Sequence, residues 1–185
     1  MQAVLAQPSA PVKGSGKALF SARRIAKRVN QLGLEISETY ADIEEPLVMV
    51  VVLKGAAVFA SDLLRSLRIP AELEFVRASS YGGGTSSSGR VKFAHMVEGP
   101  LTGRHVLLVE DIVDSGRTLN TIVRRLRRSK PASIRLAALL DRPARRVEPV
   151  DIHFTGFVIP DLFVIGYGLD YAGLYRELPA IYSLG

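Results

Sequence analysis

Residues 106–118 read VLLVEDIVDSGRT, and this stretch decides the fold. Four apolar residues in a row predict a strand that is buried on both faces of a sheet. The strand runs into the acids Glu110, Asp111 and Asp114, and then into a small-residue turn, DSGRT, that opens a helix. Backbone N–H groups converge at such a turn and, with the helix dipole, favour a phosphate group. The stretch therefore predicts a phosphate site beside acids suited to hydroxyls, a metal or a proton.

Helices and strands alternate along the rest of the chain. We expect helices over residues 21–33, 56–67 and 118–130, strands over 47–53, 73–78 and 134–140, a connecting segment over 79–92, and short apolar and aromatic stretches after residue 151. This alternation with fully apolar strands predicts an α/β fold, in which helices flank a mostly parallel central sheet. Ligands of such sheets bind at the carboxyl ends of the strands, where the acids of the signature lie.

Length and composition predict a single soluble domain. The chain has 185 residues, of which 48% are hydrophobic and 23% charged, and no run approaches the roughly 20 apolar residues of a membrane span. Residues 1–17 are rich in Ala, Pro, Ser and Gly and predict a flexible tail with no secretion signal, before one domain over residues 18–185. The absence of Cys excludes disulfides and thiolate metal sites, and agrees with a cytoplasmic protein.

A net charge of +6 raises the question of nucleic-acid binding. The basic residues concentrate in the predicted helix 118–130, where Leu119, Ile122, Val123 and Leu126 have the spacing of a core-facing stripe. The cations of this helix are Arg124, Arg125, Arg127, Arg128 and Lys130. The spacing favours a solvated face for them, with an RNA-binding patch as the alternative.

The signature stretch resembles the phosphoribosyl pyrophosphate signature of the type I phosphoribosyltransferases. Further motifs resemble the hypoxanthine-guanine branch of that family: LKG at 53–55, SY at 80–81, LLDRP at 139–143 and FVIPDLFVIGYGLDY at 157–171. The resemblance covers residues 19–184 and implies a Rossmann-like sheet with a small hood made from C-terminal and N-terminal residues. It implies purine salvage, in which phosphoribosyl pyrophosphate and hypoxanthine or guanine give IMP or GMP and pyrophosphate.

The resemblance also implies roles for individual residues. Asp114 is the expected catalytic residue, which exchanges a proton with purine N7; taken alone, it is equally a turn or N-cap residue. Magnesium is the expected cofactor, and the implied ligands are Glu110, Asp111 and Asp170. The implied phosphoribosyl pyrophosphate-binding residues are Lys54, Gly55, Ser80, Tyr81, Glu110, Asp111, Asp114, Ser115, Gly116, Arg117, Thr118 and Arg176.

Two of these donor-binding segments have alternatives in the sequence itself. Lys54 and Gly55 suit a pyrophosphate, because Gly lets it approach the backbone and Lys supplies charge, but the pair also suits an ordinary turn. The resemblance implies a non-proline cis peptide before Lys54. Residues 81–89, YGGGTSSSG, have the composition of a flexible connector, and the resemblance implies a lid over the leaving group.

The hood is expected to select the base. The implied purine-binding residues are Arg142, Phe163, Val164 and Asp170: Phe163 would stack on the ring and Val164 would offer backbone groups to its pyrimidine edge. Family members usually have Lys where this chain has Arg142, and that Lys donates to the purine 6-oxo group. Arg is also a donor but is not an equivalent point charge, so the preference among hypoxanthine, guanine and xanthine stays open.

Two alternative functions remain at this stage. One is a xanthine-preferring phosphoribosyltransferase, and the other is a nucleotide-sensing RNA-binding regulator on the same fold. The resemblance favours the hypoxanthine-guanine enzyme, implies a homodimer or homotetramer, and disfavours nucleic acid as a partner. His95, His105 and His153 lack metal-like clustering.

Overall fold

The structure is a computed structural model that describes residues 18–80, 91–97 and 99–184. Its helices are α1 (Ala22–Thr39), α2 (Ala57–Ser66) and α3 (Arg117–Leu126), with short 3-10 helices at Arg127–Ser129 and Pro143–Arg145. Its strands are β1 (Leu47–Leu53), β2 (Ala71–Ser80), β3 (Val91–His95), β4 (His105–Val113), β5 (Ser133–Asp141), β6 (Phe154–Val158), β7 (Phe163–Ile165) and β8 (Tyr182–Leu184).

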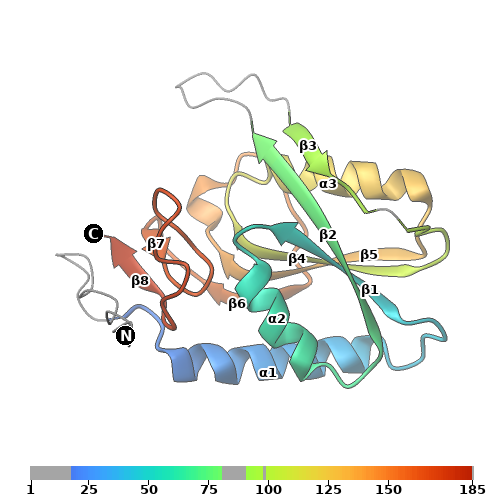
Figure 1. The fold of residues 1–185 in the computed structure, drawn as a ribbon, viewed down its shortest axis with the longest axis horizontal. Helices are drawn as coiled ribbons and strands as arrows, with labels where there is room; N and C mark the ends of the chain where they lie inside the picture. The colour runs from blue at the N-terminus through green and yellow to red at the C-terminus, as the bar shows by residue number, and fades with distance from the viewer. Residues whose placement is uncertain (1–17, 81–90, 98, 185) are drawn as a thin grey trace, which may run out of the picture.

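The six-stranded central sheet has the order β3-β2-β1-β4-β5-β6 and is parallel except for β3. Side chains of β1 alternate between two cores: Met49 and Val51 pack with α1 and α2, whereas Val48 and Val50 pack with α3. Helices therefore cover both faces of the sheet, as Figure 1 shows. The predicted α/β class is confirmed.

The strand order brings three predicted site segments to one edge of the sheet. Strand β4 lies between β1 and β5, with Val51 opposite Val109 and Val113 opposite Asp141. Because these strands are parallel, the residues that follow Leu53, Val113 and Asp141 all emerge at the carboxyl edge. Three segments thus start side by side: the one that begins at Lys54, the predicted phosphate-binding turn of residues 114–118 (the phosphate turn), and the one that begins at Arg142.

Helix α1 continues to Thr39, so the helix end that we expected near Gly33 is wrong. The buried stripe extends one turn further, to Ile36, and the glycine is internal to the helix. A Cβ atom at Gly33 would lie 2.2 Å from Ser66 Oγ. This glycine therefore marks a close crossing of α1 and α2 and does not end the helix.

The connecting segment that we expected over residues 79–92 is shorter in the structure. Strand β2 extends to Ser80, and β3 begins at Val91 and pairs antiparallel with it, an edge strand that the sequence did not predict. The predicted lid, residues 81–89, and the predicted tail, residues 1–17, lie outside the described residues.

A two-stranded sheet, β7 and β8, forms the hood beside the carboxyl edge (Figure 1). Phe20, just before α1, forms a two-way backbone bridge with Ile181, so residues from both parts of the chain contribute to the hood, as expected. No helix in the described ranges is long and apolar enough to cross a membrane.

Candidate active site

The two acids at the end of β4 lie on neighbouring positions with different environments. Glu110 is buried, with 8% of its surface exposed, and its Oε1 accepts from the backbone N–H of Asp111 (3.1 Å). Asp111 Oδ1 accepts from the N–H of Ile112 (2.8 Å). Burial, and then the charge of Asp111, raise the pKa of the Glu110 carboxyl. A cation or hydroxyl donors would relieve this unfavourable pair of carboxylates.

The turn after β4 presents unused backbone donors. Gly116 has φ +85°, a left-handed conformation, and α3 begins at the next residue. Within the described residues, the N–H groups of Asp114, Ser115, Gly116, Arg117 and Thr118 make no hydrogen bond. Five free donors at a helix N-terminus suit an anion, the ligand that the sequence predicts for this turn.

Asp114 lies against Arg142 and is not a side-chain cap of α3. Arg142 Nη2 is 3.0 Å from Asp114 Oδ2, and Nη1 donates to the carbonyl of Leu162 (2.6 Å). Arg142 is only 7% exposed. Two buried polar atoms of this pair, Arg142 Nε and Asp114 Oδ1, have no hydrogen-bond partner in the described chain. The pair therefore contains one donor and one acceptor that the described chain leaves without a partner, while the rest of the Asp114 side chain is 40% exposed.

The segment after β1 contacts both the acids and the hood. The Leu53–Lys54 peptide is cis, as the resemblance implied, and Lys54 is exposed. A Cβ atom at Gly55 would lie 1.7 Å from Asp111 Oδ2, so only Gly lets the acid approach this backbone. On the other side, the Gly55 carbonyl would lie 2.3 Å from a Cβ at Gly168 of the hood.

The hood residues divide into two groups. Phe163 is 45% exposed and packs edge-to-face on Tyr171, with ring centroids 5.7 Å apart, whereas the neighbouring Val164 is buried. Asp170 and Arg176 pair with each other (2.6 Å), and Arg176 also donates to the Gly168 carbonyl (2.5 Å). An exposed ring can accept a stacked base, while the Asp170–Arg176 pair lies beside the Gly55 segment.

Some predicted residues lie apart or outside the described chain. Ser80 is the last residue of β2, and Tyr81 is not among the described residues. The described residues hold no group of three or more acids, histidines or cysteines arranged for a metal ion. Glu110 and Asp111 form no ion pair with any described residue, so these two carboxylates fit a magnesium ion that a substrate helps to ligate.

Sequence reasoning missed two residues that hold the site together. Arg146 donates to the Asp114 carbonyl (2.9 Å) and pairs with Asp141. The Tyr167 hydroxyl donates to Asp62 of α2 (2.6 Å), and burial, followed by this bond, raises the pKa of the Tyr167 hydroxyl. The bonds from Arg146 to Asp114 and from Tyr167 to Asp62 join segments distant in sequence, so the sequence does not reveal them. The one local sign of a special position is the glycine on each side of Tyr167, whose backbone is left-handed.

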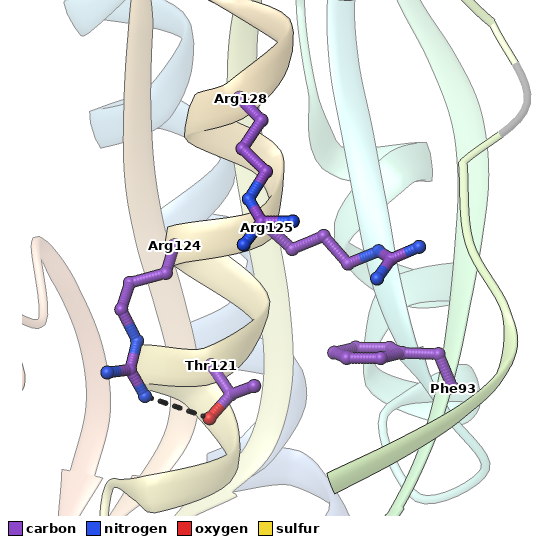
Figure 2. Close-up of a pocket in the computed structure, with 5 residues that line it drawn as sticks. All are labelled: Phe93, Thr121, Arg124, Arg125 and Arg128. Atoms are coloured by element: carbon purple, nitrogen blue, oxygen red, sulfur yellow. Dashed lines mark hydrogen bonds between the residues drawn. The ribbon is translucent and has the colours of Figure 1, made fainter.

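A hollow of about 270 Å³ lies away from the phosphate turn, at the C-terminal end of α3 (Figure 2). Arg125 stacks over Phe93 (5.1 Å), and Arg124 donates to Thr121 (3.2 Å). The cations of the predicted helix 118–130 are exposed, which confirms the solvated face. The hollow offers side-chain cations near a helix C-terminus, whereas the phosphate turn presents free backbone N–H groups at a helix N-terminus, the arrangement that favours a phosphate.

Comparisons with known proteins agree with the motifs. Residues 15–172 match the phosphoribosyl transferase domain family. The chain is 44% identical to the hypoxanthine-guanine phosphoribosyltransferase of Mycobacterium avium, over 97% of this chain and 91% of that protein. It is 41% identical to the hypoxanthine phosphoribosyltransferase of Salmonella typhimurium, over 92% and 96%. The crystal structure of a hypoxanthine phosphoribosyltransferase from Staphylococcus aureus superposes with a TM-score of 0.88 at 37% identity, over 94% and 93% of the two chains.

Proposed function

Because this chain belongs to the phosphoribosyl transferase family, we propose that it is a purine salvage transferase. It moves the 5-phosphoribosyl group from phosphoribosyl pyrophosphate to hypoxanthine or guanine, giving IMP or GMP and releasing pyrophosphate. The relatives support this activity, and they support neither the xanthine-preferring enzyme nor the RNA-binding regulator.

The Asp114–Arg142 pair carries the assignment of the base. The Arg142 guanidinium can only donate, and the Asp114 carboxylate, whose side chain is 40% exposed, accepts. A 6-oxopurine presents the complement on adjacent positions: N7–H donates and the 6-oxo group accepts. Adenine would bring its 6-amino donor toward a guanidinium that can only donate. The pair therefore favours hypoxanthine and guanine over adenine.

The remaining residues divide the rest of the chemistry. The free N–H groups of 115–118 and the Thr118 hydroxyl hold the 5-phosphate, and Glu110 and Asp111 face the ribose hydroxyls. Purine N9 attacks C1 of the ribose as the bond from C1 to pyrophosphate breaks. Asp114 accepts the N7 proton, and the neighbouring carboxylates offset the positive charge that builds on the ribose.

Charge on the leaving group requires cations. Lys54 and Arg176 lie on the two segments that meet at Gly55 and Gly168, and both suit pyrophosphate oxygens. Magnesium would neutralise part of the charge of the donor, with Glu110 and Asp111 as its ligands on the ribose side and Asp170 beside the pyrophosphate, because these three acids are not gathered around one position. Asp170 forms an ion pair with Arg176, so a magnesium ion on Asp170 would lie beside the guanidinium proposed for the same pyrophosphate. Ser80 and Tyr81 remain the proposed contacts from the lid.

The proposal extends to the setting of the enzyme. We expect a cytoplasmic homodimer or homotetramer in which residues 18–185 form one domain. Size-exclusion chromatography with light scattering tests the oligomeric state.

Release of pyrophosphate with each free base tests the function. Purified protein with magnesium and phosphoribosyl pyrophosphate should release pyrophosphate with hypoxanthine and guanine, and far more slowly with adenine. A strong preference for xanthine would replace the proposed base, and no release with any of the four purines would overturn the function. Fluorescence anisotropy with a labelled RNA, measured at increasing salt, tests the regulator directly.

A further inference from the structure

Three consecutive carbonyls of the phosphate turn are all held by one segment, residues 142–148. The Val113 carbonyl accepts from the N–H of Arg142 (3.1 Å) and from Arg146 Nη2 (3.3 Å). The Asp114 carbonyl accepts from Arg146 Nε (2.9 Å). The Ser115 carbonyl accepts from the N–H groups of Val147 (3.0 Å) and Glu148 (2.9 Å). The turn is therefore clamped from a single side.

This clamp decides where the donors of the turn point. In a planar trans peptide the C=O and the following N–H point in opposite directions. With the carbonyls of residues 113–115 directed to the clamp, the N–H groups of residues 114–116 point away from it. These N–H groups are three of the five that make no hydrogen bond to a described residue. The clamp thus ensures that N–H groups, and not carbonyl oxygens, face the proposed phosphate site.

The turn needs such a constraint because it contains Gly116. A glycine at φ +85° lets neighbouring peptide planes rotate at low cost, and one rotation would aim a carbonyl at the bound phosphate. The clamp also leaves no room above this glycine. A Cβ atom at Gly116 would lie 2.5 Å from the Glu148 carbonyl oxygen.

Among the described residues, Arg146 is the one side chain that donates to two of these carbonyls and also reaches a neighbouring strand. Its side chain is 17% exposed, and its Nη2 pairs with Asp141, the last residue of β5, which lies opposite Val113 of β4. The preceding Arg145 has 52% exposure and pairs with Asp161 instead. These three bonds come from two separate nitrogens of a planar fork, Nε and Nη2, and the single nitrogen of a lysine does not reproduce that spacing.

We propose that Arg146 is a positioning residue for the transfer reaction. It fixes the Val113–Asp114 backbone so that the turn offers N–H groups to the 5-phosphate and the Asp114 carboxylate to the base. This inference rests on the proposed function, and it assigns a role to a residue outside the donor and base contacts.

Substitution of Arg146 by Met or Lys, compared with Arg28→Met, tests this role. Arg28 is a matched control because it donates to two carbonyls, of Thr155 and Gly156, and pairs with Glu35, but lies between α1 and β6. We expect Arg146→Met to raise the KM for phosphoribosyl pyrophosphate and lower kcat, each about tenfold, because a misdirected turn binds the 5-phosphate less well and aims Asp114 less well in the transition state. The KM for hypoxanthine should change less, by no more than about threefold, since Arg142 still pairs with the Asp114 carboxylate and Arg146 forms no hydrogen bond with a described residue of the hood.

Arg146→Lys should lie between the parent and Arg146→Met, because one ammonium restores the charge beside Asp141 but not the fork. Arg28→Met should keep the parent kcat and KM with a comparable loss of Tm. The inference is overturned if Arg146→Met matches Arg28→Met in kcat and KM. If Arg146→Met does not fold, parent kinetics in Arg146→Lys would overturn it equally. A parent protein that releases no pyrophosphate would instead overturn the proposed function.

Discussion

Arg142 lies 3.0 Å from Asp114 in an ion pair that joins the segment after β5 to the turn after β4, with the Arg142 side chain buried and the Asp114 side chain 40% exposed. The same guanidinium donates to the Leu162 carbonyl, so it also reaches the segment before β7. One side chain thus holds the candidate proton acceptor, the sheet edge and the hood in a fixed relation. Removal of the Asp114 charge would leave the buried Arg142 guanidinium without its partner.

Asp114→Asn should lower kcat for hypoxanthine about 10²- to 10⁴-fold, because the amide keeps the shape but cannot take the N7 proton. Activity should not vanish, since the free N–H groups of the turn still hold the 5-phosphate. Single-turnover kinetics measure the loss, with Asp42→Asn, an exposed position before β1, as control. A kcat within twofold of the parent would exclude Asp114 as the proton acceptor.

Arg142→Met should lower kcat/KM for hypoxanthine and guanine about 10- to 100-fold, because a charged donor to the 6-oxo group is lost. Arg142→Lys should retain more activity than Arg142→Met, since it keeps one cationic donor. Initial rates with hypoxanthine, guanine, xanthine and adenine measure both effects. Equal losses for hypoxanthine and adenine in Arg142→Met would contradict a role in reading the 6-position.

Gly55→Ala should raise the KM for phosphoribosyl pyrophosphate about tenfold, because the new methyl group must displace Asp111. The matched control is Gly99→Ala, where a Cβ atom would lie 3.8 Å from its nearest neighbour, Glu74 Oε1. If Gly55→Ala binds the donor as the parent does, then the contact of Asp111 with this backbone has no part in donor binding.

Glu110→Gln should stabilise the protein when metal and donor are both absent, yet raise the KM for the donor. The raised pKa of the Glu110 carboxyl means that its ionised form disfavours folding. The parent protein should therefore become more stable as the pH falls toward that pKa and Glu110 is protonated. Thermal unfolding of chelator-treated protein measures the gain. An unchanged or lower Tm in Glu110→Gln at neutral pH would show that burial does not destabilise this carboxylate.

Tyr167→Phe should lower the free energy of unfolding by about 1 kcal/mol, the usual net contribution of one hydrogen bond. The raised pKa keeps the Tyr167 hydroxyl protonated in the folded protein. The difference in unfolding free energy between parent and Tyr167→Phe should therefore persist up to the pKa of tyrosine in the unfolded chain, 10.0, and diminish at higher pH. Urea unfolding at several pH values, with Tyr182→Phe as control, measures the difference.

The sequence predicted the elements whose signal is local. Unbroken apolar runs located β1, β4 and β5, and the amphipathic spacing of α3 separated its buried leucines from its exposed arginines. The phosphate turn was also readable, because acids, glycine and the helix start lie within nine residues, 110–118. The cis peptide before Lys54 came from the resemblance, since no residue type there demands it.

Features that depend on distant partners could not be predicted. Gly33 looked like a helix end because its reason, Ser66 of the neighbouring helix, lies 33 residues away. Arg142 was expected to face the base, and its bonds to Asp114 and Leu162 required the folded hood. Arg146 resembled any surface arginine until its carbonyl partners were known.

Strand β4 is inserted between β1 and β5, although α2, β2 and β3 separate it from β1 in sequence. A partly folded chain in which only β1 and β2 have paired therefore has no complete substrate pocket. Substrates can recognise only the finished sheet, so their binding energy adds in full to the native state and not to such precursors. The concentration of substrate should accordingly govern how long the enzyme survives heat and proteases.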